Sequence, residues 1–463
     1  MRMSKQFLSR AARFSESKPQ FSVRFVAALL VLLFIFSTTF RLTGSAQRAP
    51  QQSATTTSAA RNAALVAATA DVLKETSEIR RLSILRPVQS STQSRAEIER
   101  TLVKNLDDEM TTAQLHASEV TLRRLGLAPS DFQYRDLMIR LLTEQVAGYY
   151  DPKTQHFHLA DWIDLDGQKP IMAHELTHAL QDQHFNLRRF EHWPKGDSDA
   201  ELAAHALIEG DATLAMAQYV ANSPLRVLAF LKSLAATGMP SEELDKAPRA
   251  LRETLLFPYQ DGEKWVGILY SQEGWEGVSK AFTQLPQSTE QILHPAKYFA
   301  HEPPVKLTLA DITNVLNASS GSWRRIDSDV NGEWGLYLIL DQFLKSPAES
   351  RRAAAGWGGD RYALYEGSRG EAMLVSMSAW DTEGDAREFF DAYIKRTELR
   401  YPRATSTEPS YNTQLSTLSK SFATSEGVVS IDLRGGRVLI LEGAPANADI
   451  GALKTALWRK PSS

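Results

Sequence analysis

The chain contains no cysteine among its 463 residues. It therefore has no disulfide bond and no zinc site built on thiolates, so histidine, glutamate or aspartate would have to hold any metal. Stability must then come from a hydrophobic core and from such a metal. The length of the chain is sufficient for roughly two or three domains, and 43% hydrophobic residues are sufficient for a sizeable core.

Acidic residues outnumber basic residues beyond the N-terminus. The formal net charge is -3 for the whole chain, and it falls to -9 without the first 46 residues, which hold seven basic residues and one acidic residue. Proteins that bind phosphate backbones need clustered lysine and arginine. The sequence therefore predicts no nucleic-acid partner.

Long apolar runs are also missing, with one exception. Residues 25–36 are uniformly apolar, the run continues without charge to Phe40, and basic residues precede it. This pattern predicts a cytoplasmic segment at 1–24, a signal anchor or signal peptide at 25–43, and a flexible linker at 44–62. We expect a single-pass protein of the cell membrane with an extracytoplasmic, periplasmic body, or a secreted protein if the segment is cleaved.

Hydrophobic periodicity predicts an α+β fold in two domains. A mainly helical domain is expected over 63–345, with a small β-hairpin formed by residues 146–150 and 156–160, and a C-terminal α+β domain with an antiparallel sheet over 346–463. The expected helices are 63–81, one beginning at Ser94, 134–144, 170–184, 199–221, 224–236, 243–256, 262–270, 274–283, a mostly helical stretch at 305–345, 384–399 and 448–457. The expected strands of the second domain are 362–365, 372–377, 428–433 and 438–441.

The most specific chemical signal is the H-E-x-x-H pattern formed by His174, Glu175 and His178. At about 100° per residue, positions four apart lie on the same helix face, where two imidazoles can bind one metal ion. The apolar residues around them predict a buried helix, in which unpartnered imidazoles and a carboxylate would be costly. A zinc ion would satisfy all three side chains.

Catalytic zinc normally has three protein ligands, so a third donor is required. His184 follows His178 by six residues, but Gln181 stands where zincins with this spacing have a helix-breaking glycine, and a continuing helix would turn His184 about 80° away from the ligand face. Glu209, on the next strong helix, is the second candidate. Glu201 and His205 share that helix and are rival donors.

The motifs resemble those of gluzincin-type metallopeptidases, whose third ligand is a glutamate on a second helix. The greatest likeness is to poorly characterised exported bacterial proteins that carry H-E-L-T-H-A-L-Q-D-Q-H-F and E-G-D-A, here His174–Phe185 and Glu209–Ala212. The likeness extends to the hairpin at Tyr150 and to Ser288–Pro295. It implies a zincin-like domain, Zn2+ as the cofactor and Glu209 as the third ligand. Thr213 stands where gluzincins commonly place an orienting aspartate, with Asp211 nearer.

A peptidase mechanism follows from such a site. Glu175 is expected to act as the general base on a metal-activated water and then as the general acid. His294 and Tyr298 are candidates for stabilising the oxyanion. The hairpin could bind an extended protein or peptide substrate along its edge. The alternative function is a zinc-stabilised binding or scaffold protein of the cell envelope without catalysis.

Overall fold

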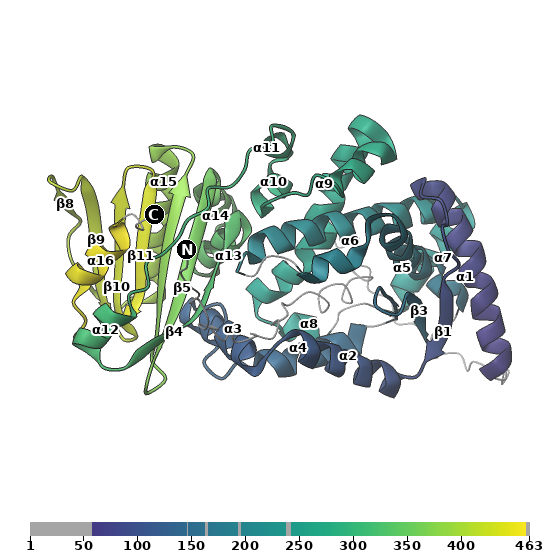
Figure 1. Cartoon of the computed structure of the whole chain (residues 1–463), viewed down its shortest axis with the longest axis horizontal. Helices are drawn as coiled ribbons and strands as arrows, with labels where there is room; N and C mark the ends of the chain where they lie inside the picture. Colours follow the sequence, from purple (N-terminus) through teal and green to yellow (C-terminus); the bar gives the residue numbers. More distant parts are fainter. Residues whose placement is uncertain (1–57, 146, 163–164, 193–195, 238–241, 460–463) are drawn as a thin grey trace, which may run out of the picture.

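The computed structural model describes residues 58–459, except 146, 163–164, 193–195 and 238–241. They form a helical body and a sheet body that lie side by side along the longest axis of the molecule (Figure 1). The prediction of an α+β fold with an antiparallel sheet in the C-terminal part is confirmed.

The helical body holds most of the helices and a small sheet. Its helices are α1 (Ser58–Arg80), α2 (Arg95–Glu109), α3 (Thr112–Arg124), α4 (Tyr134–Gln145), α5 (Leu165–Phe185), the 3-10 helix η1 (Leu187–His192), α6 (Ser198–Ala221), α7 (Pro224–Thr237), α8 (Glu242–Lys246), α9 (Arg249–Ala281), α10 (Thr289–Leu293) and α11 (Pro295–Phe299). Its strands are β1 (Gln89–Gln93), β2 (Gly148–Asp151) and β3 (His156–Ala160).

The small sheet has the order β1-β3-β2, with β3 parallel to β1 and antiparallel to β2. β2 and β3 form the predicted hairpin, and Asp151 closes its turn by accepting hydrogen bonds from Lys153 N (2.8 Å) and the Thr154 hydroxyl (2.7 Å). The sequence analysis missed β1 because its five residues are all polar and carry no alternation. Pairing with β3, not local pattern, makes them a strand.

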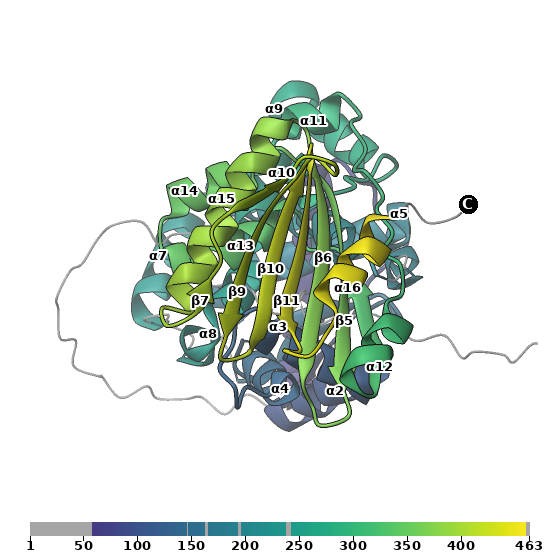
Figure 2. The same cartoon turned by 90° about the vertical axis from the view of Figure 1, so that its left-hand side faces the viewer.

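The sheet body contains one large antiparallel sheet. Its strands are β4 (Trp323–Asp329), β5 (Trp357–Gly367), β6 (Ala372–Trp380), β7 (Thr405–Ser406), β8 (Ser410–Asn412), β9 (Thr417–Thr424), β10 (Gly427–Arg434) and β11 (Arg437–Ala444), and its helices are α12 (Thr313–Ser320), α13 (Gly332–Leu344), α14 (Pro347–Ala354), α15 (Glu383–Arg400) and α16 (Ile450–Trp458). The strand order is β4-β5-β6-β11-β10-β9-β7, and β8 pairs with β9. α13, α14 and α15 cover one face, while α12 and α16 lie on the other (Figure 2).

Two predicted boundaries differ from the structure. The stretch 305–345 contains the helices α12 and α13, as predicted, but β4 lies between them and is an edge strand of the large sheet. The sheet therefore begins before residue 346, where the sequence analysis placed the domain boundary. The three helices expected between 243 and 283 are instead the short α8 and the long α9, which is kinked at Gly274 with a φ of 63°. Glycine permits this backbone conformation at little cost.

The predicted single-pass arrangement, with an extracytoplasmic body that is anchored or secreted, is corrected. Across the part of residues 58–459 that the structure describes, no helix is long and apolar enough to cross a membrane. The longest helices of the core carry charged residues along their length, as α6 does at Glu209 and Asp211. The apolar run at 25–36 and its flanks lie outside the described residues.

Helices α6 and α9 approach each other closely at two glycines. A Cβ atom built on Gly210 would lie 2.4 Å from the carbonyl carbon and oxygen of Gly262, and one built on Gly262 would lie 2.3 Å from Ala206 O. Real Cβ contacts are never this short, so the two backbones touch only because both residues lack a side chain. This crossing fixes the position of α9 next to Glu209.

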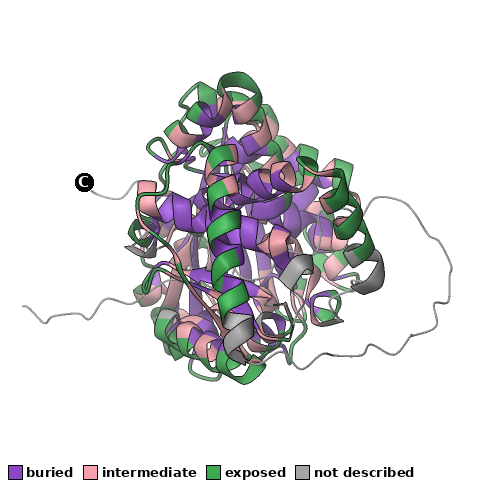
Figure 3. Cartoon of the chain, turned by 90° about the vertical axis from the view of Figure 1, so that its right-hand side faces the viewer, coloured by how far each residue is buried: buried purple, intermediate pink, exposed green. Residues whose placement is uncertain are grey.

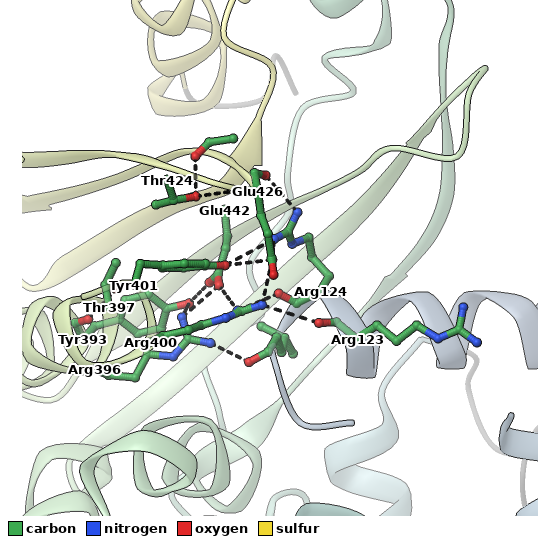
Figure 4. Close-up of polar contacts among 12 residues, drawn as sticks. Arg123, Arg124, Tyr393, Arg396, Thr397, Arg400, Tyr401, Thr424, Glu426 and Glu442 are labelled. Atoms are coloured by element: carbon green, nitrogen blue, oxygen red, sulfur yellow. Dashed lines mark hydrogen bonds and ion pairs between the residues drawn. The ribbon is translucent and has the colours of Figure 1, made fainter. Parts of the chain in front are cut away.

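A buried polar network joins the helical body to the sheet body (Figure 4). Arg396 and Arg400 of α15 donate to the fully buried Glu442 of β11, at 2.8 and 2.5 Å. The same two arginines donate to the last carbonyls of α3, at Arg124 (2.8 Å) and Leu125 (2.6 Å). Cations at a helix C-terminus satisfy carbonyls that have no partner within the helix, so this network holds the end of α3 against the sheet.

The glycine crossing predicts opposite effects for two substitutions on the same helix. Gly262→Ala forces the backbones of α6 and α9 apart and should destabilise the fold by about 1–3 kcal/mol, as overpacking does. Gly267→Ala, where a Cβ would meet nothing within 4 Å, should be neutral or stabilise by about 0.5–1 kcal/mol. Thermal unfolding followed by circular dichroism measures both. Equal midpoints for the two variants would contradict a tight crossing at Gly262.

Candidate metal centre

Helices α5 and α6 bring together the three residues predicted to bind a metal. His174 and His178 lie one turn apart on α5, and Glu209 faces them from α6. Their Nε2 atoms are 3.2 Å apart, and Glu209 Oε2 lies 3.1 Å from His174 Nε2 and 3.3 Å from His178 Nε2. One ligand atom from each residue thus lies within 4.8 Å of the others, and all three residues are buried. This group could hold a metal ion.

The ring planes favour convergence on one ion. The imidazoles of His174 and His178 stand at 86° to each other, with centroids 4.8 Å apart, so two in-plane lone pairs can meet at one point. His156 and His158 on β3 provide a contrast, because their rings are stacked at 22°. Both of these rings contact the Ser91 hydroxyl, at 3.0 and 3.2 Å, and among the described residues no carboxylate joins them in a three-donor group.

Gln181 determines which nitrogen of His178 carries a proton. The Gln181 amide nitrogen donates to Asp211 Oδ2 (2.9 Å) and to Ile208 O (3.0 Å). Its oxygen therefore faces His178 Nδ1 at 2.9 Å, and Nδ1 must be the donor. In the neutral imidazole, the lone pair is then on Nε2, which faces Glu209 and His174.

The chemistry of this donor set fits a cation. Without one, the Nε2 lone pair of neutral His178 would face a carboxylate oxygen and a second imidazole nitrogen, in a site where these side chains are only 3–7% exposed. A proton or a metal ion has to lie between them. Two imidazole nitrogens and one carboxylate oxygen are the ligand set of many catalytic zinc sites, although other divalent first-row metals accept the same donors.

Electrostatics show how strongly positive charge is favoured at this point. Burial alone would lower the pKa of His178, but the charge and hydrogen bond of Glu209, together with the charge of Glu175 and the hydrogen bond to Gln181, outweigh burial and raise the pKa to about 9. Burial alone would raise the pKa of Glu209, but the charge of His178 and the hydrogen bonds from the two imidazoles lower it to about 2. A metal cation would take the place of the proton that the pair otherwise shares.

Glu175 lies next to these donors and is oriented by the hairpin. Its Oε2 accepts a hydrogen bond from the backbone N–H of Tyr150 in β2 (3.0 Å). Burial raises the pKa of Glu175, while the histidines on either side of it in the motif oppose that effect. The Tyr150 hydroxyl donates to Asp182 (3.0 Å), which ties the same strand to α5. The hairpin thus positions the carboxylate predicted to act as the base.

Tyr259 of α9, which was not among the residues predicted from sequence, also faces the site. Its ring stacks on His174, with centroids 6.3 Å apart. Burial, together with the negative charges of Glu209 and Glu175 and a hydrogen bond to Glu209, raises the pKa of its hydroxyl well above the usual value. No motif marks Tyr259, which lies 50 residues beyond Glu209. Gly262, one helical turn away, was the only local sign that α9 passes close to another helix.

The two residues proposed for the oxyanion have other partners in the structure. His294 Nε2 contacts Glu333 of α13 (2.9 Å), and the Tyr298 hydroxyl donates to Gln284 O (2.8 Å). Within the described residues, neither His294 nor Tyr298 belongs to the group formed by His174, His178 and Glu209.

The surrounding motif, Ser288–Pro295, acts as a structural joint. The Thr289 hydroxyl donates to the buried Asp199 at the start of α6 (2.5 Å) and accepts from Trp334 N of α13 (3.2 Å). Glu290 pairs with Lys297 (2.7 Å). These contacts link the start of the Glu209 helix to the sheet body.

The remaining candidate ligands lie outside the three-donor group. His184 Nε2 contacts Ser83 O (2.7 Å), in agreement with the prediction that an unbroken helix turns it away from the metal. Glu201 and His205 lie on α6, about two turns and one turn before Glu209 respectively, and are not members of the group. Of the donors considered from sequence, the described structure brings together His174, His178 and Glu209.

Comparison with known families adds one match, which lies in the sheet body. Residues 321–454 match a family model described as a domain of unknown function (DUF8575). This region contains β4 to β11 and begins two residues before β4, so it supports the earlier start of the sheet. No curated protein and no solved structure matches the chain.

Proposed function

We propose that the protein is a zinc-dependent peptidase of the gluzincin type, with a zincin-like helical body. The observation that carries the proposal is the convergence of His174, His178 and Glu209, with Glu175 held beside them by the backbone of β2. The H-E-x-x-H helix and the separate glutamate helix are the arrangement on which gluzincin catalysis depends.

The residues of the chain divide the chemistry between them. When bound by His174, His178 and Glu209, zinc supplies a Lewis acid for the scissile carbonyl and lowers the pKa of a water molecule. Glu175 removes the proton from that water and carries it to the leaving amine, a role that suits a carboxylate with a raised pKa. The Tyr259 hydroxyl donates to the developing oxyanion. Tyr259 replaces His294 and Tyr298 as our candidate for this role.

The small sheet supports a peptide as the substrate. β2 is an edge strand in the order β1-β3-β2, but residues 148–150 are buried and the Tyr150 N–H donates to Glu175, so a peptide would pair with this edge only after the elements that cover it move. An extended peptide bound along such an edge satisfies its backbone groups without depending on sequence. It would also lie beside the general base.

One observation favours a second candidate, a zinc-stabilised scaffold without catalysis. His174, Glu175, His178, Glu209 and Tyr259 are only 2–6% exposed, and structural zinc sites are closed. The position of Glu175 distinguishes the two functions, since a structural site does not need a buried carboxylate that is not a ligand.

The ligand assignment predicts how zinc binding responds to substitution. The purified protein should hold one equivalent of zinc by elemental analysis. His174→Ala, His178→Ala or Glu209→Ala should each abolish stoichiometric binding, because catalytic zinc needs three protein donors. His184→Ala serves as the matched control and should keep the zinc. A loss at His184 equal to that at Glu209 would reverse the assignment of the third ligand.

Glu175→Gln tests catalysis separately from metal binding. The variant should retain zinc, since Glu175 is not a ligand, and should lose at least about 100-fold in kcat toward an unfolded protein substrate, the usual contribution of a general base. Full zinc content with no hydrolysis by the parent protein would instead favour the scaffold function.

Tyr259→Phe tests the oxyanion donor. Removing only the hydroxyl should lower kcat by about 100- to 1000-fold with little change in KM or zinc content, as for the loss of one oxyanion-hole donor. Tyr298→Phe is the matched control, since its hydroxyl is bonded to a backbone carbonyl away from the metal centre. Equal loss in the two variants would argue against a direct role for Tyr259.

A further inference from the structure

We propose that Arg80 and Asp211 are positioning residues of the metal centre, which act through Gln181 to hold His178 with Nε2 directed to the metal. The inference rests on the proposed zinc site. It adds two residues that bind no metal, one of which lies on a helix that contributes no ligand.

Four side chains are connected in series, in the order Arg80, Asp211, Gln181 and His178. The first contact in this series is a fully buried ion pair. Arg80 Nε lies 2.5 Å from Asp211 Oδ1, and neither side chain has any exposed surface. Arg80 comes from the last turn of α1, a helix that is exposed along its outer side (Figure 3). Its guanidinium also lies over the Trp275 ring at 4.6 Å and donates to the Ser279 hydroxyl at 3.1 Å. The arginine is thus fixed from α1 and α9 together.

The second contact fixes the Gln181 amide. Asp211 uses one carboxylate oxygen for Arg80 and the other to accept from Gln181 Nε2 (2.9 Å). Ile208 O is the second acceptor of that nitrogen. A flipped amide would place the Gln181 oxygen against a carboxylate and a carbonyl, two repulsive contacts without water to relieve them. Asp211 therefore determines which way the Gln181 amide faces. Arg80 provides the positive charge that pairs with the buried Asp211 carboxylate.

The third contact orients the His178 ring, because the fixed Gln181 amide presents its oxygen to that ring. Gln181 Oε1 accepts from His178 Nδ1 (2.9 Å), which keeps the proton on Nδ1 and leaves Nε2 free to bind a metal. Hydrogen bonds of this kind orient metal-binding histidines in general, and their loss typically costs 10- to 100-fold in affinity, as an order-of-magnitude estimate. His174 differs, because its Nδ1 is buried without a partner among the described residues.

A purely structural ion pair is the competing explanation. Both explanations predict that the loss of Arg80 or Asp211 alone destabilises the protein, since the partner would be left as a buried unpaired charge. The double substitution Arg80→Met with Asp211→Leu avoids this, because it removes both charges at similar volume. Gln181→Met removes only the hydrogen bonds that connect Asp211 to His178, and it leaves the ion pair between Arg80 and Asp211 intact.

The experiment combines zinc affinity with a direct view of the His178 ring. In the full chain, Gln181→Met and the Arg80→Met/Asp211→Leu pair should each weaken zinc binding by about 10- to 100-fold in a chelator competition. Glu442→Gln is the control, because it disrupts a buried ion-pair network in the sheet body, and it should lower stability without changing zinc affinity. The inference would be overturned if zinc affinity were unchanged in both Gln181→Met and the Arg80→Met/Asp211→Leu pair. An equal loss of zinc affinity in Glu442→Gln would also overturn it.

A measurement without metal separates this inference from the zinc site itself. In histidine-labelled, metal-free protein, nitrogen NMR should show a slowly exchanging Nδ1–H on His178 that disappears in Gln181→Met. If the parent protein has this proton and binds no zinc, the proposed function is wrong, but the hydrogen-bonded series Arg80–Asp211–Gln181–His178 is supported. If the proton is absent from the parent protein, the inference about Arg80 and Asp211 is wrong, whatever the metal content.

Discussion

The close contact between α6 and α9 is the constraint on which the site depends. Glu209 and Gly210 are consecutive, so the residue that supplies the carboxylate is followed by the residue that lets α9 approach. Tyr259 lies about one turn before Gly262, which places its ring on His174 and its hydroxyl at Glu209. The glycine of the E-G-D-A motif thus has a packing role, and the position of Tyr259 over His174 depends on it.

Exclusion of water gives the centre its electrostatic character. The five residues of the site are 2–6% exposed, so charges within it interact more strongly than they would at the surface. This explains why Glu209 and His178 shift each other's pKa in opposite directions. It also means that Glu175 is closed to solvent in this conformation.

Local patterns predicted the features that depend on nearby residues. The hairpin, the H-E-x-x-H helix and the second helix with Glu209 were all predicted, because each combines a clear periodicity with a short motif. Tyr259 could not be predicted, since its place depends on how α9 crosses α6. β4 and β1 were missed for a related reason: each becomes a strand by pairing with residues distant in sequence. His294 was chosen for its type and its motif, whereas its contact with Glu333 shows a joint between helices.

The wide spacing of the site along the chain has a consequence for synthesis. Arg80 is made 131 residues before its partner Asp211, and Tyr259 comes later still. A chain that has emerged only as far as α5 carries both histidines and Glu175 but neither Glu209 nor the tyrosine that faces it. The nascent polypeptide therefore has no complete centre while it is still on the ribosome with only α5 exposed. Assembly of the site, with Tyr259 in place over His174, must wait until α9 has been translated and can cross α6.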